Sequence, residues 1–136
     1  MRKFLLALVI CLTIPFIETE AQTYRYQASQ FAYRIRNAYG NWTSWSNWQY
    51  SQIVIDITMD KDVIIVYSDP RQVYAVYEYV GAENDSGGGR QVYYKVIDQD
   101  YDYGTVRLRI EANGNSQMYV DFNDVSWCYS GLKRIY

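Results

Sequence analysis

Between Val63 and Tyr129 the chain alternates apolar and polar residues in short runs that are separated by turn-forming residues. Successive residues of a β-strand point to opposite faces of a sheet, so this alternation predicts strands with one buried and one solvated face. The apolar sets are clearest in three runs: Val92, Tyr94 and Val96; Val106, Leu108 and Ile110; Met118, Val120 and Phe122. A shift of one residue would bury arginine side chains, so these sets fix which face of each strand is buried.

Three of the strands begin with the same pattern of glutamine, an apolar residue and tyrosine: Gln72-Val73-Tyr74, Gln91-Val92-Tyr93 and Gln117-Met118-Tyr119. The register predicts that these tyrosines point away from the core, beside two arginines of an intervening strand. This outward set is Tyr74, Tyr93, Arg107, Arg109 and Tyr119. Two interpretations are open. The set either forms cross-strand pairs that each stabilise a solvated face by about 0.2–1 kcal/mol, or it forms a platform for a ligand.

The strands on either side of Asp69-Pro70 are harder to orient, because both of their faces carry apolar residues. Residues 63 to 67 are apolar on both faces, which is typical of a strand that is covered on both sides. In residues 72 to 80 the expected inward set is Val73, Ala75, Tyr77 and Tyr79. This choice agrees with the outward position predicted for Tyr74.

Turn signals divide the chain into short segments. Asn113-Gly114 is typical of a two-residue β-hairpin, and residues 81 to 89, which include Gly87 to Gly89, are expected to form a flexible hairpin loop. Residues 30 to 37 and 53 to 58 alternate like the hairpin strands, and no segment shows a convincing helical period. The sequence therefore predicts a single all-β domain, an antiparallel meander of about eight short strands that is closed as a barrel or folded as a sandwich.

The N-terminus has the features of a secretory signal peptide. Arg2 and Lys3 precede an apolar run, Phe4 to Ile14, that is too short to cross a membrane, and the small residue Ala21 offers a cleavage site. We expect residues 1–21 to be removed and residues 22–136 to form the mature domain. That domain would be secreted or periplasmic, without a membrane span.

The composition argues against most catalytic and cofactor chemistry. The chain has no histidine, and Cys128 is the single cysteine after the expected leader, so Ser–His pairs, Cys–His pairs and cysteine-rich zinc sites are excluded. No phosphate-binding glycine motif is present, and a net charge of −2 gives no reason to expect nucleic acid as a partner. Hydrolysis by paired carboxylates stays formally open, because aspartate and glutamate are plentiful. We expect a protein that is not an enzyme and uses no cofactor.

Three alternating aspartates, Asp98, Asp100 and Asp102, resemble the start of a calcium-binding loop. The glycine that follows, Gly104, is one position late, and Arg109 stands where the closing glutamate of an EF-hand belongs. The sequence therefore predicts an acidic hairpin turn and no metal site.

The neighbours of Cys128 leave its role open. Val125, Trp127 and Tyr129 form the expected core set of the last strand, and this register would turn Cys128 outward. A free cysteine is usually a small buried hydrophobe, whereas an odd cysteine in a secreted chain can also pair with another molecule.

Trp42, Trp45 and Trp48 follow one another at intervals of three residues, with Thr, Ser and Asn between them. Such a spacing keeps side chains on one edge of an extended helix and not on one face of a strand. The aromatic edge either plugs an open end of the sheet or stays available to stack on a sugar ring. The segment resembles the tryptophan ladder of thrombospondin type 1 repeats, and the resemblance implies that Arg34 and Arg36 stack on the tryptophans. The cysteines of that family are missing, so the resemblance carries neither its fold nor its function.

Exposed aromatic residues without catalytic machinery predict a secreted protein that works by binding, and a glycan-like ligand is the leading candidate. The candidate binding residues are Trp42, Trp45, Trp48, Tyr74, Tyr93, Arg107, Arg109 and Tyr119. Two alternatives stay open. One is an interaction or inhibitor module that docks on another protein through its Tyr/Arg face, and the other is a small barrel that holds an internal apolar ligand.

Overall fold

A computed structural model describes residues 23–58, 61–111 and 115–135. The expected signal peptide and the Asn113-Gly114 turn lie outside these residues. The strands, in chain order, are β1 (Thr23–Gln27), β2 (Gln30–Ile35), β3 (Gln49–Tyr50), β4 (Val54–Thr58), β5 (Val63–Val66), β6 (Gln72–Asn84), β7 (Arg90–Ile97), β8 (Tyr103–Ile110), β9 (Ser116–Asp121) and β10 (Val125–Arg134). The described part of the chain contains no helix, and therefore none long and apolar enough to cross a membrane.

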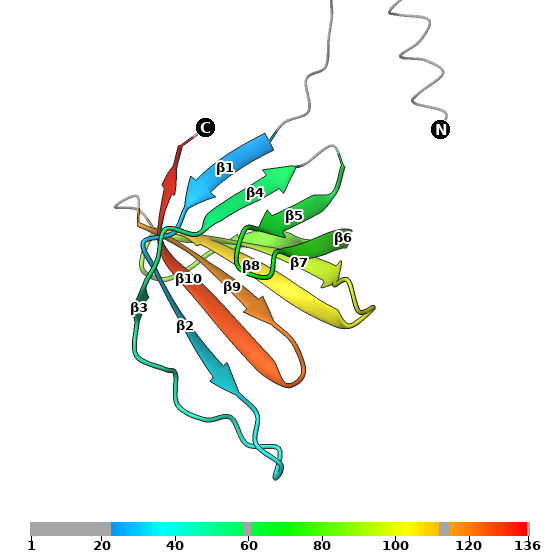
Figure 1. The fold of residues 1–136 in the computed structure, drawn as a ribbon. Coiled ribbons are helices and arrows are strands. Elements are labelled where there is room, and N and C mark those ends of the chain that lie inside the picture. The colour runs from blue at the N-terminus through cyan, green and yellow to red at the C-terminus, as the bar shows by residue number, and fades with distance from the viewer. Residues whose placement is uncertain (1–22, 59–60, 112–114, 136) are drawn as a thin grey trace, which may run out of the picture.

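The strands form one antiparallel sheet that closes into a barrel (Figure 1). Strands β4 to β10 pair with their neighbours in sequence order, as expected for a meander with short connections. Strand β1 closes the barrel, because it pairs with β4 along its length and with β10 at Lys133 and Arg134. The all-β prediction is confirmed, and of its two forms the barrel is correct. Eight strands make the barrel, and β2 and β3 are additional.

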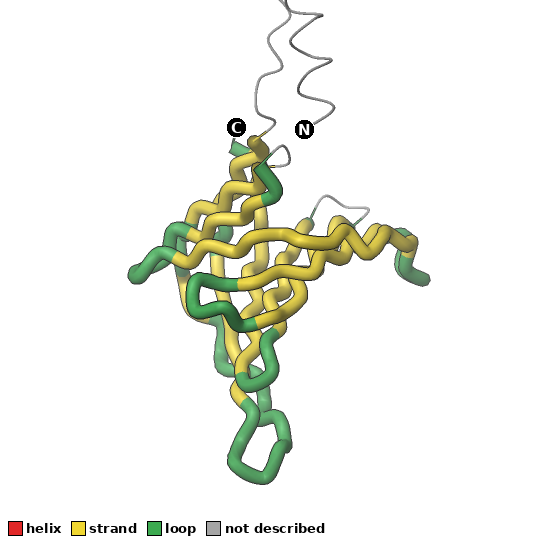
Figure 2. The backbone as a smooth tube through the Cα atoms, turned by 90° about the vertical axis from the view of Figure 1, so that its right-hand side faces the viewer, coloured by secondary structure: helices red, strands yellow, loops and turns green. Residues whose placement is uncertain are grey.

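Strand β2 leaves the barrel wall because β10 changes partner along its length. Residues 125–130 of β10 pair with β2, whereas its last residues pair with β1. Gly131 lies at this change, with a φ of +63° and a β-bulge beside it. A Cβ atom there would lie 2.0 Å from Ser29 Oγ, so glycine suits both the backbone and the contact. As a result β2, β9 and β10 diverge from β5 to β7, and the segment after β2 projects at the lower end of the barrel (Figures 1 and 2).

Side chains fill the barrel interior. The largest fully buried side chains are Tyr129, Ile55, Ile64, Met118, Val66, Val96, Val106, Val120 and Ser126. The inward sets predicted for β7, β8 and β9 are confirmed, although Ile110, at the end of β8, is partly exposed. A void near Ile64 and Tyr94 has a volume of about 20 Å³, which is close to the size of one water molecule.

The prediction that Tyr74 points outward is wrong. Tyr74 is 3% exposed and lies in the core, so Val73 and Ala75 face outward on β6. Tyr77 and Tyr79 are about half exposed, and the pairing of β6 with β7 shifts register at Tyr77 and again directly after Tyr79. The sequence was ambiguous here since both faces of β6 are apolar, and the pairing of Tyr74 with Ile64 of β5 decides the register.

Strand β5 is covered on one face only. Ile64 and Val66 are buried in the core, whereas the outward residues Val63 and Ile65 are only half-buried. The prediction that this strand is covered on both sides is therefore wrong for the described part of the chain.

Candidate functional site

The tryptophan segment, residues 42–50, lies along the free edge of β2. The N–H groups of Thr43 and Ser46 donate to the carbonyls of Ile35 and Tyr33, at 2.8 and 2.7 Å. Their side-chain hydroxyls accept hydrogen bonds from the N–H groups of the same two β2 residues, at 3.1 and 3.0 Å. Gln49 then pairs with Phe31 in β3. Three residues of the segment therefore match two residues of β2, which explains the three-residue spacing of the tryptophans.

This docking stacks the tryptophans on arginines of β2. The guanidinium of Arg34 lies over the rings of Trp42 and Trp45, at 4.7 and 4.8 Å from the ring centroids, and that of Arg36 lies over Trp42 at 4.7 Å. The stacking implied by the thrombospondin-type resemblance is confirmed. The alternative in which the tryptophans plug an open end of the sheet is wrong, because the stack lies on the outer face of the barrel.

The stack continues across the barrel wall. The ring of Trp45 meets Tyr119 of β9 edge-on, with centroids 6.3 Å apart, and Arg107 of β8 lies 4.1 Å over the Tyr119 ring. We call this series the tryptophan–arginine ladder; its members are Arg36, Trp42, Arg34, Trp45, Tyr119 and Arg107. Two guanidinium groups cover the Trp42 ring and one covers the Trp45 ring. These ring faces are therefore in contact with arginines of the same chain.

The ladder resolves the position of Cys128. Cys128 faces outward on β10, opposite Ala32 on β2 and Tyr119 on β9, yet it is only 3% exposed. Burial beneath the ladder raises the pKa of its thiol to about 11. A buried thiol that stays protonated is a small hydrophobe with little reactivity. Outward orientation and burial are therefore compatible, because the tryptophan segment covers this face.

Of the other candidate residues on the outer surface, Tyr93 and Arg109 bond to carboxylates of the chain, whereas Trp48 is exposed. The Tyr93 hydroxyl donates to Glu83 at 2.8 Å, and this carboxylate raises the pKa of Tyr93. Arg109 pairs with Asp85 at 3.1 Å and with Glu111, so it anchors the loop between β6 and β7. Trp48 is 51% exposed and, within the described residues, has no stacked ring or cation. Four of the predicted residues therefore lie together in the ladder: Trp42, Trp45, Tyr119 and Arg107. Trp48 is exposed to solvent, and the guanidinium of Arg109 is paired with carboxylates.

A hollow at one end of the barrel is a second site, and it contains mostly residues that sequence reasoning missed. Its volume is about 560 Å³. It is lined by Pro70, Arg71, Gln72, Val73, Tyr74, Asp98, Gln99, Asp100, Asp102, Phe122, Asp124, Val125 and Trp127. We call it the barrel mouth. Tyr74 is the one predicted site residue in it, although it reaches the mouth from the inward face.

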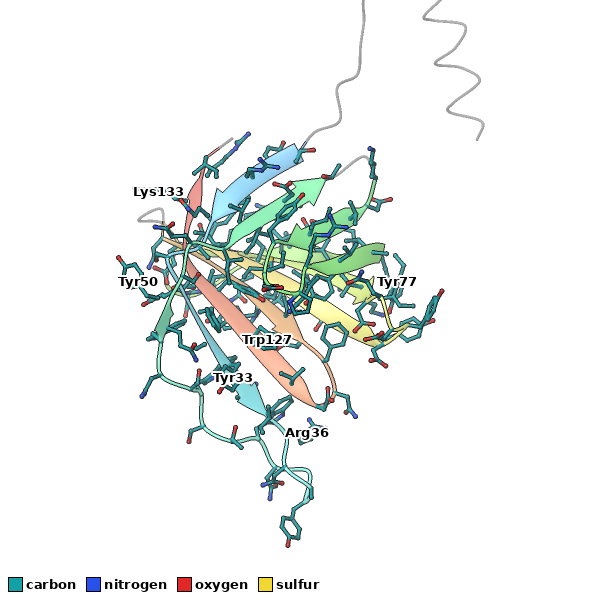
Figure 3. The ribbon with its side chains drawn as sticks, viewed as in Figure 1. Tyr33, Arg36, Tyr50, Tyr77, Trp127 and Lys133 are labelled. Carbon is teal, nitrogen blue, oxygen red and sulfur yellow. The ribbon has the colours of Figure 1, made fainter. Side chains whose placement is uncertain are left out.

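Aromatic rings form the floor of the barrel mouth. The rings of Tyr74 and Phe122 lie 5.9 Å apart, and the ring of Trp127 lies 5.7 Å from that of Tyr33 on the neighbouring strand (Figure 3). Phe122 packs directly over Gly104, where a Cβ atom would lie 2.8 Å from the ring. Burial raises the pKa of Tyr74, whose hydroxyl donates to Gln72. The floor is therefore a packed aromatic surface with one polar corner, where Tyr74 bonds to Gln72.

Carboxylates, amides and one guanidinium form the rim of the mouth. One oxygen of Asp98 accepts hydrogen bonds from the N–H groups of Asp100 and Asp102, both at 2.9 Å, so this carboxylate shapes its own turn. Gln99, Asp100 and Asp102 are exposed at the tip of the hairpin. Residues 23–58, 61–111 and 115–135 contain no group of three acidic or cysteine side chains placed to hold a metal ion.

Two signals in the sequence point to the mouth. Trp127 belongs to the inward set of β10, yet it lies near the start of that strand, where a barrel opens. The turn at Asp98 follows β7 directly and contributes three carboxylates to the same end of the barrel. Comparisons with known proteins add no assignment, because no family model, no curated protein and no solved structure matches this chain.

Proposed function

We propose that this protein is a non-catalytic binding protein that takes a glycan-type ligand in the barrel mouth. The observation that carries the proposal is a hollow of about 560 Å³ with an aromatic floor and a polar rim. Small-molecule sites are typically concave, with apolar walls and a few polar groups that fix orientation. Sugar rings have this same duality, since their C–H faces pack on aromatic rings and their hydroxyls bond to polar groups.

The rim offers suitable partners for hydroxyl groups. Carboxylates accept hydrogen bonds, the guanidinium of Arg71 donates them, and the amide of Gln99 does both. Four aspartates and one arginine line the hollow, so its local charge is negative and an acidic sugar is disfavoured. A neutral or amino-bearing glycan fits this charge best.

The other binding proposals have weaker support. A packed interior, with Val66, Val96 and Val120 fully buried, leaves little room for an internal apolar ligand. The aromatic faces of the ladder are occupied by Arg34 and Arg36, which argues against the ladder as the main glycan platform. The non-catalytic part of the proposal rests on the absence of histidine and of any recognised catalytic motif.

A glycan array followed by calorimetry on the strongest hit tests the proposal. Gln99→Ala removes an exposed rim amide and should weaken binding about 2- to 12-fold, the value of one hydrogen bond. Gln52→Ala is the matched control, since Gln52 is exposed and does not line the mouth. Incubation of the hit with the protein should release no hydrolysis product.

Two results would contradict the proposal. One is the absence of any glycan hit. The other is binding that survives Gln99→Ala and Trp127→Phe but is lost in Trp48→Ala, which would place the platform on the exposed tryptophan instead of in the mouth. If the bound glycan were hydrolysed, the binding site would still be supported, but the claim that the protein is non-catalytic would be wrong.

A further inference from the structure

The outer face of the barrel is apolar on β5, on the start of β6, and at the adjoining ends of β7 and β8. Cross-strand pairing aligns Val63, Ala75, Ile97 and Tyr103 in one row. Ile65 and Val73 form the next row, and Tyr67 and Tyr77 lie at the margins. We call these residues the outer apolar face: Val63, Ile65, Tyr67, Val73, Ala75, Tyr77, Ile97 and Tyr103. No residue of this set carries a charge at neutral pH.

No described part of the chain covers this face. Tyr103 is 67% exposed, Tyr77 is 51% exposed and Tyr67 is 41% exposed. The rings of Tyr77 and Tyr103 contact each other edge-to-face at 5.6 Å, so they form one continuous surface. If a whole tyrosine exposes about 200 Å², these three rings alone present about 300 Å² to solvent. Patches of this size on a monomer often mark an interaction site.

The face lies apart from both sites described above. Figure 3 shows Tyr77 well separated from Tyr33 and Arg36. Of the outer apolar face, only Val73 also lines the barrel mouth. A partner on this face would therefore contact the mouth only at Val73 and leave the rest of the mouth and the tryptophan–arginine ladder accessible.

We propose that the outer apolar face is the contact surface between two copies of this chain. Its margins carry charges of both signs: Arg25 pairs with Asp56 at 2.7 Å on one flank, and Lys95 pairs with Glu78 at 3.6 Å on the other. A two-fold dimer places the same patch on both partners, so the uncharged centres can meet, and the paired charges at the margins leave no net charge to repel the second copy. An anionic membrane would favour a basic excess at the margin, which this face lacks.

The area indicates a weak dimer. Stable interfaces bury about 800 Å² on each partner, more than the exposed tyrosines supply even with the half-buried aliphatic side chains around them. Dimerisation should therefore depend on concentration and appear between micromolar and millimolar protein. The two mouths would remain open in the dimer, so the second copy would double the number of ligand sites.

Sedimentation equilibrium of the mature chain tests this proposal. The weight-average mass should rise from the monomer value toward twice that value as concentration increases. Ala75→Arg places a charge at the centre of the face and should raise the dissociation constant at least tenfold, because Ala75 is exposed in the monomer. Ala38→Arg is the matched control: Ala38 is also exposed but lies in the loop after β2, and its dissociation constant should not change.

Three outcomes would overturn the proposal: a monomer at millimolar concentration, a dimer that survives Ala75→Arg, or equal weakening by Ala38→Arg. Binding of the monomer to vesicles of neutral or anionic lipid would assign the face to a membrane instead. If Ala75→Arg lowers the melting temperature by itself, the double variant Tyr77→Ser with Tyr103→Ser replaces it, since both side chains are exposed.

Discussion

The two sides of the barrel wall differ in what covers them. On the side made by β2, β9 and β10, the outward residues Ala32, Ser126, Cys128 and Ser130 are all buried. They are small or weakly polar, and the tryptophan–arginine ladder lies on this side. On the other side, the outward residues of β5, of the start of β6 and of the adjoining ends of β7 and β8 are larger and apolar, and no described part of the chain lies over them.

This difference shows how to recognise a covered outer face in a sequence. Small residues at outward positions, such as Ala32 and Cys128, leave room for a second layer that the same chain supplies. Tyrosine and aliphatic residues at outward positions, such as Tyr103 and Ile65, mark a face whose cover must come from elsewhere or is absent. A covered face also carries residues that bind its cover: Arg34 of β2 and Arg36 directly after this strand stack on the Trp42 ring and hold the tryptophan segment in place.

The largest effect is expected from removal of the cover. Trp45→Ala should lower the free energy of unfolding by about 2–3 kcal/mol, somewhat less than a fully buried ring, because Trp45 is partly exposed. It should also expose Cys128, whose labelling by a thiol reagent should accelerate at least tenfold in the native state. Tyr103→Ala on the uncovered side is the control and should change stability by less than about 0.5 kcal/mol. Equal losses in the two variants would remove the distinction between the two sides.

A smaller effect is expected from the arginine at the centre of the ladder. Arg34→Ala should cost about 1–2 kcal/mol, because this guanidinium lies over two tryptophan rings. Arg34→Lys keeps the charge but not the planar stacking surface, so it should recover less than half of the loss. Arg90→Ala, at an exposed position of β7, should have no measurable effect. If lysine restored full stability, charge alone would hold the ladder and stacking would be irrelevant.

The alternation of β7, β8 and β9 predicted their buried faces correctly for a physical reason. Each has an apolar set on one face and charged or strongly polar residues such as Lys95 and Arg107 on the other, so only one register avoids buried charge. Strand β6 lacks this asymmetry, since Val73 and Tyr74 are both acceptable in a core. Its orientation depends on pairing with β5 and on two register shifts, which no local pattern encodes.

The sites were only partly predictable. The three-residue period predicted an aromatic edge, and the resemblance predicted its arginine partners, but the face on which the edge lies depends on docking to the free edge of β2. The barrel mouth was missed because its lining comes from three separate segments at strand ends and turns, residues 70–74, 98–102 and 122–127. Such a site exists only after the barrel closes, so no single segment carries its signature.

Equivalent turns on the two sides offer a milder comparison. In residues 37–41, on the covered side, the Asn37 side chain accepts two backbone hydrogen bonds and Gly40 takes a φ of +81°. In residues 98–102, at the end of β7, Asp98 plays the same role, but the equivalent position is Tyr101 with a φ of +64°. The second turn therefore holds a bulky residue in the left-handed region, which only glycine enters without cost.

Exchange of these residues should change stability in opposite directions. Tyr101→Gly should stabilise the protein by about 0.5–1 kcal/mol, and Gly40→Ala should destabilise it by about 1 kcal/mol. The effect at Gly40 is one of backbone conformation alone, because a Cβ atom there would meet nothing within 4 Å. Thermal denaturation of both variants measures the changes. Destabilisation by Tyr101→Gly would indicate that the exposed tyrosine makes a contact worth more than the strain.

The smallest effect concerns the ion pair at the margin of the outer apolar face. Asp56 is buried, and its hydrogen bonds with the half-exposed Arg25 hold the pKa of its carboxyl below the usual value. A carboxyl whose folded pKa is lowered contributes stability that is complete above its unfolded pKa, about 4, and is lost as the pH falls through the folded value. The wild-type protein should therefore lose this contribution below about pH 4, whereas Asp56→Asn should lack it at every pH.

Urea denaturation at neutral and acidic pH measures the free energy of unfolding of both proteins. The other carboxylates contribute equally to both, so their effect cancels in the difference. The two stability curves should converge as the pH falls. Parallel curves would mean that Arg25 does not lower the pKa of Asp56, and that this ion pair does not stabilise the fold.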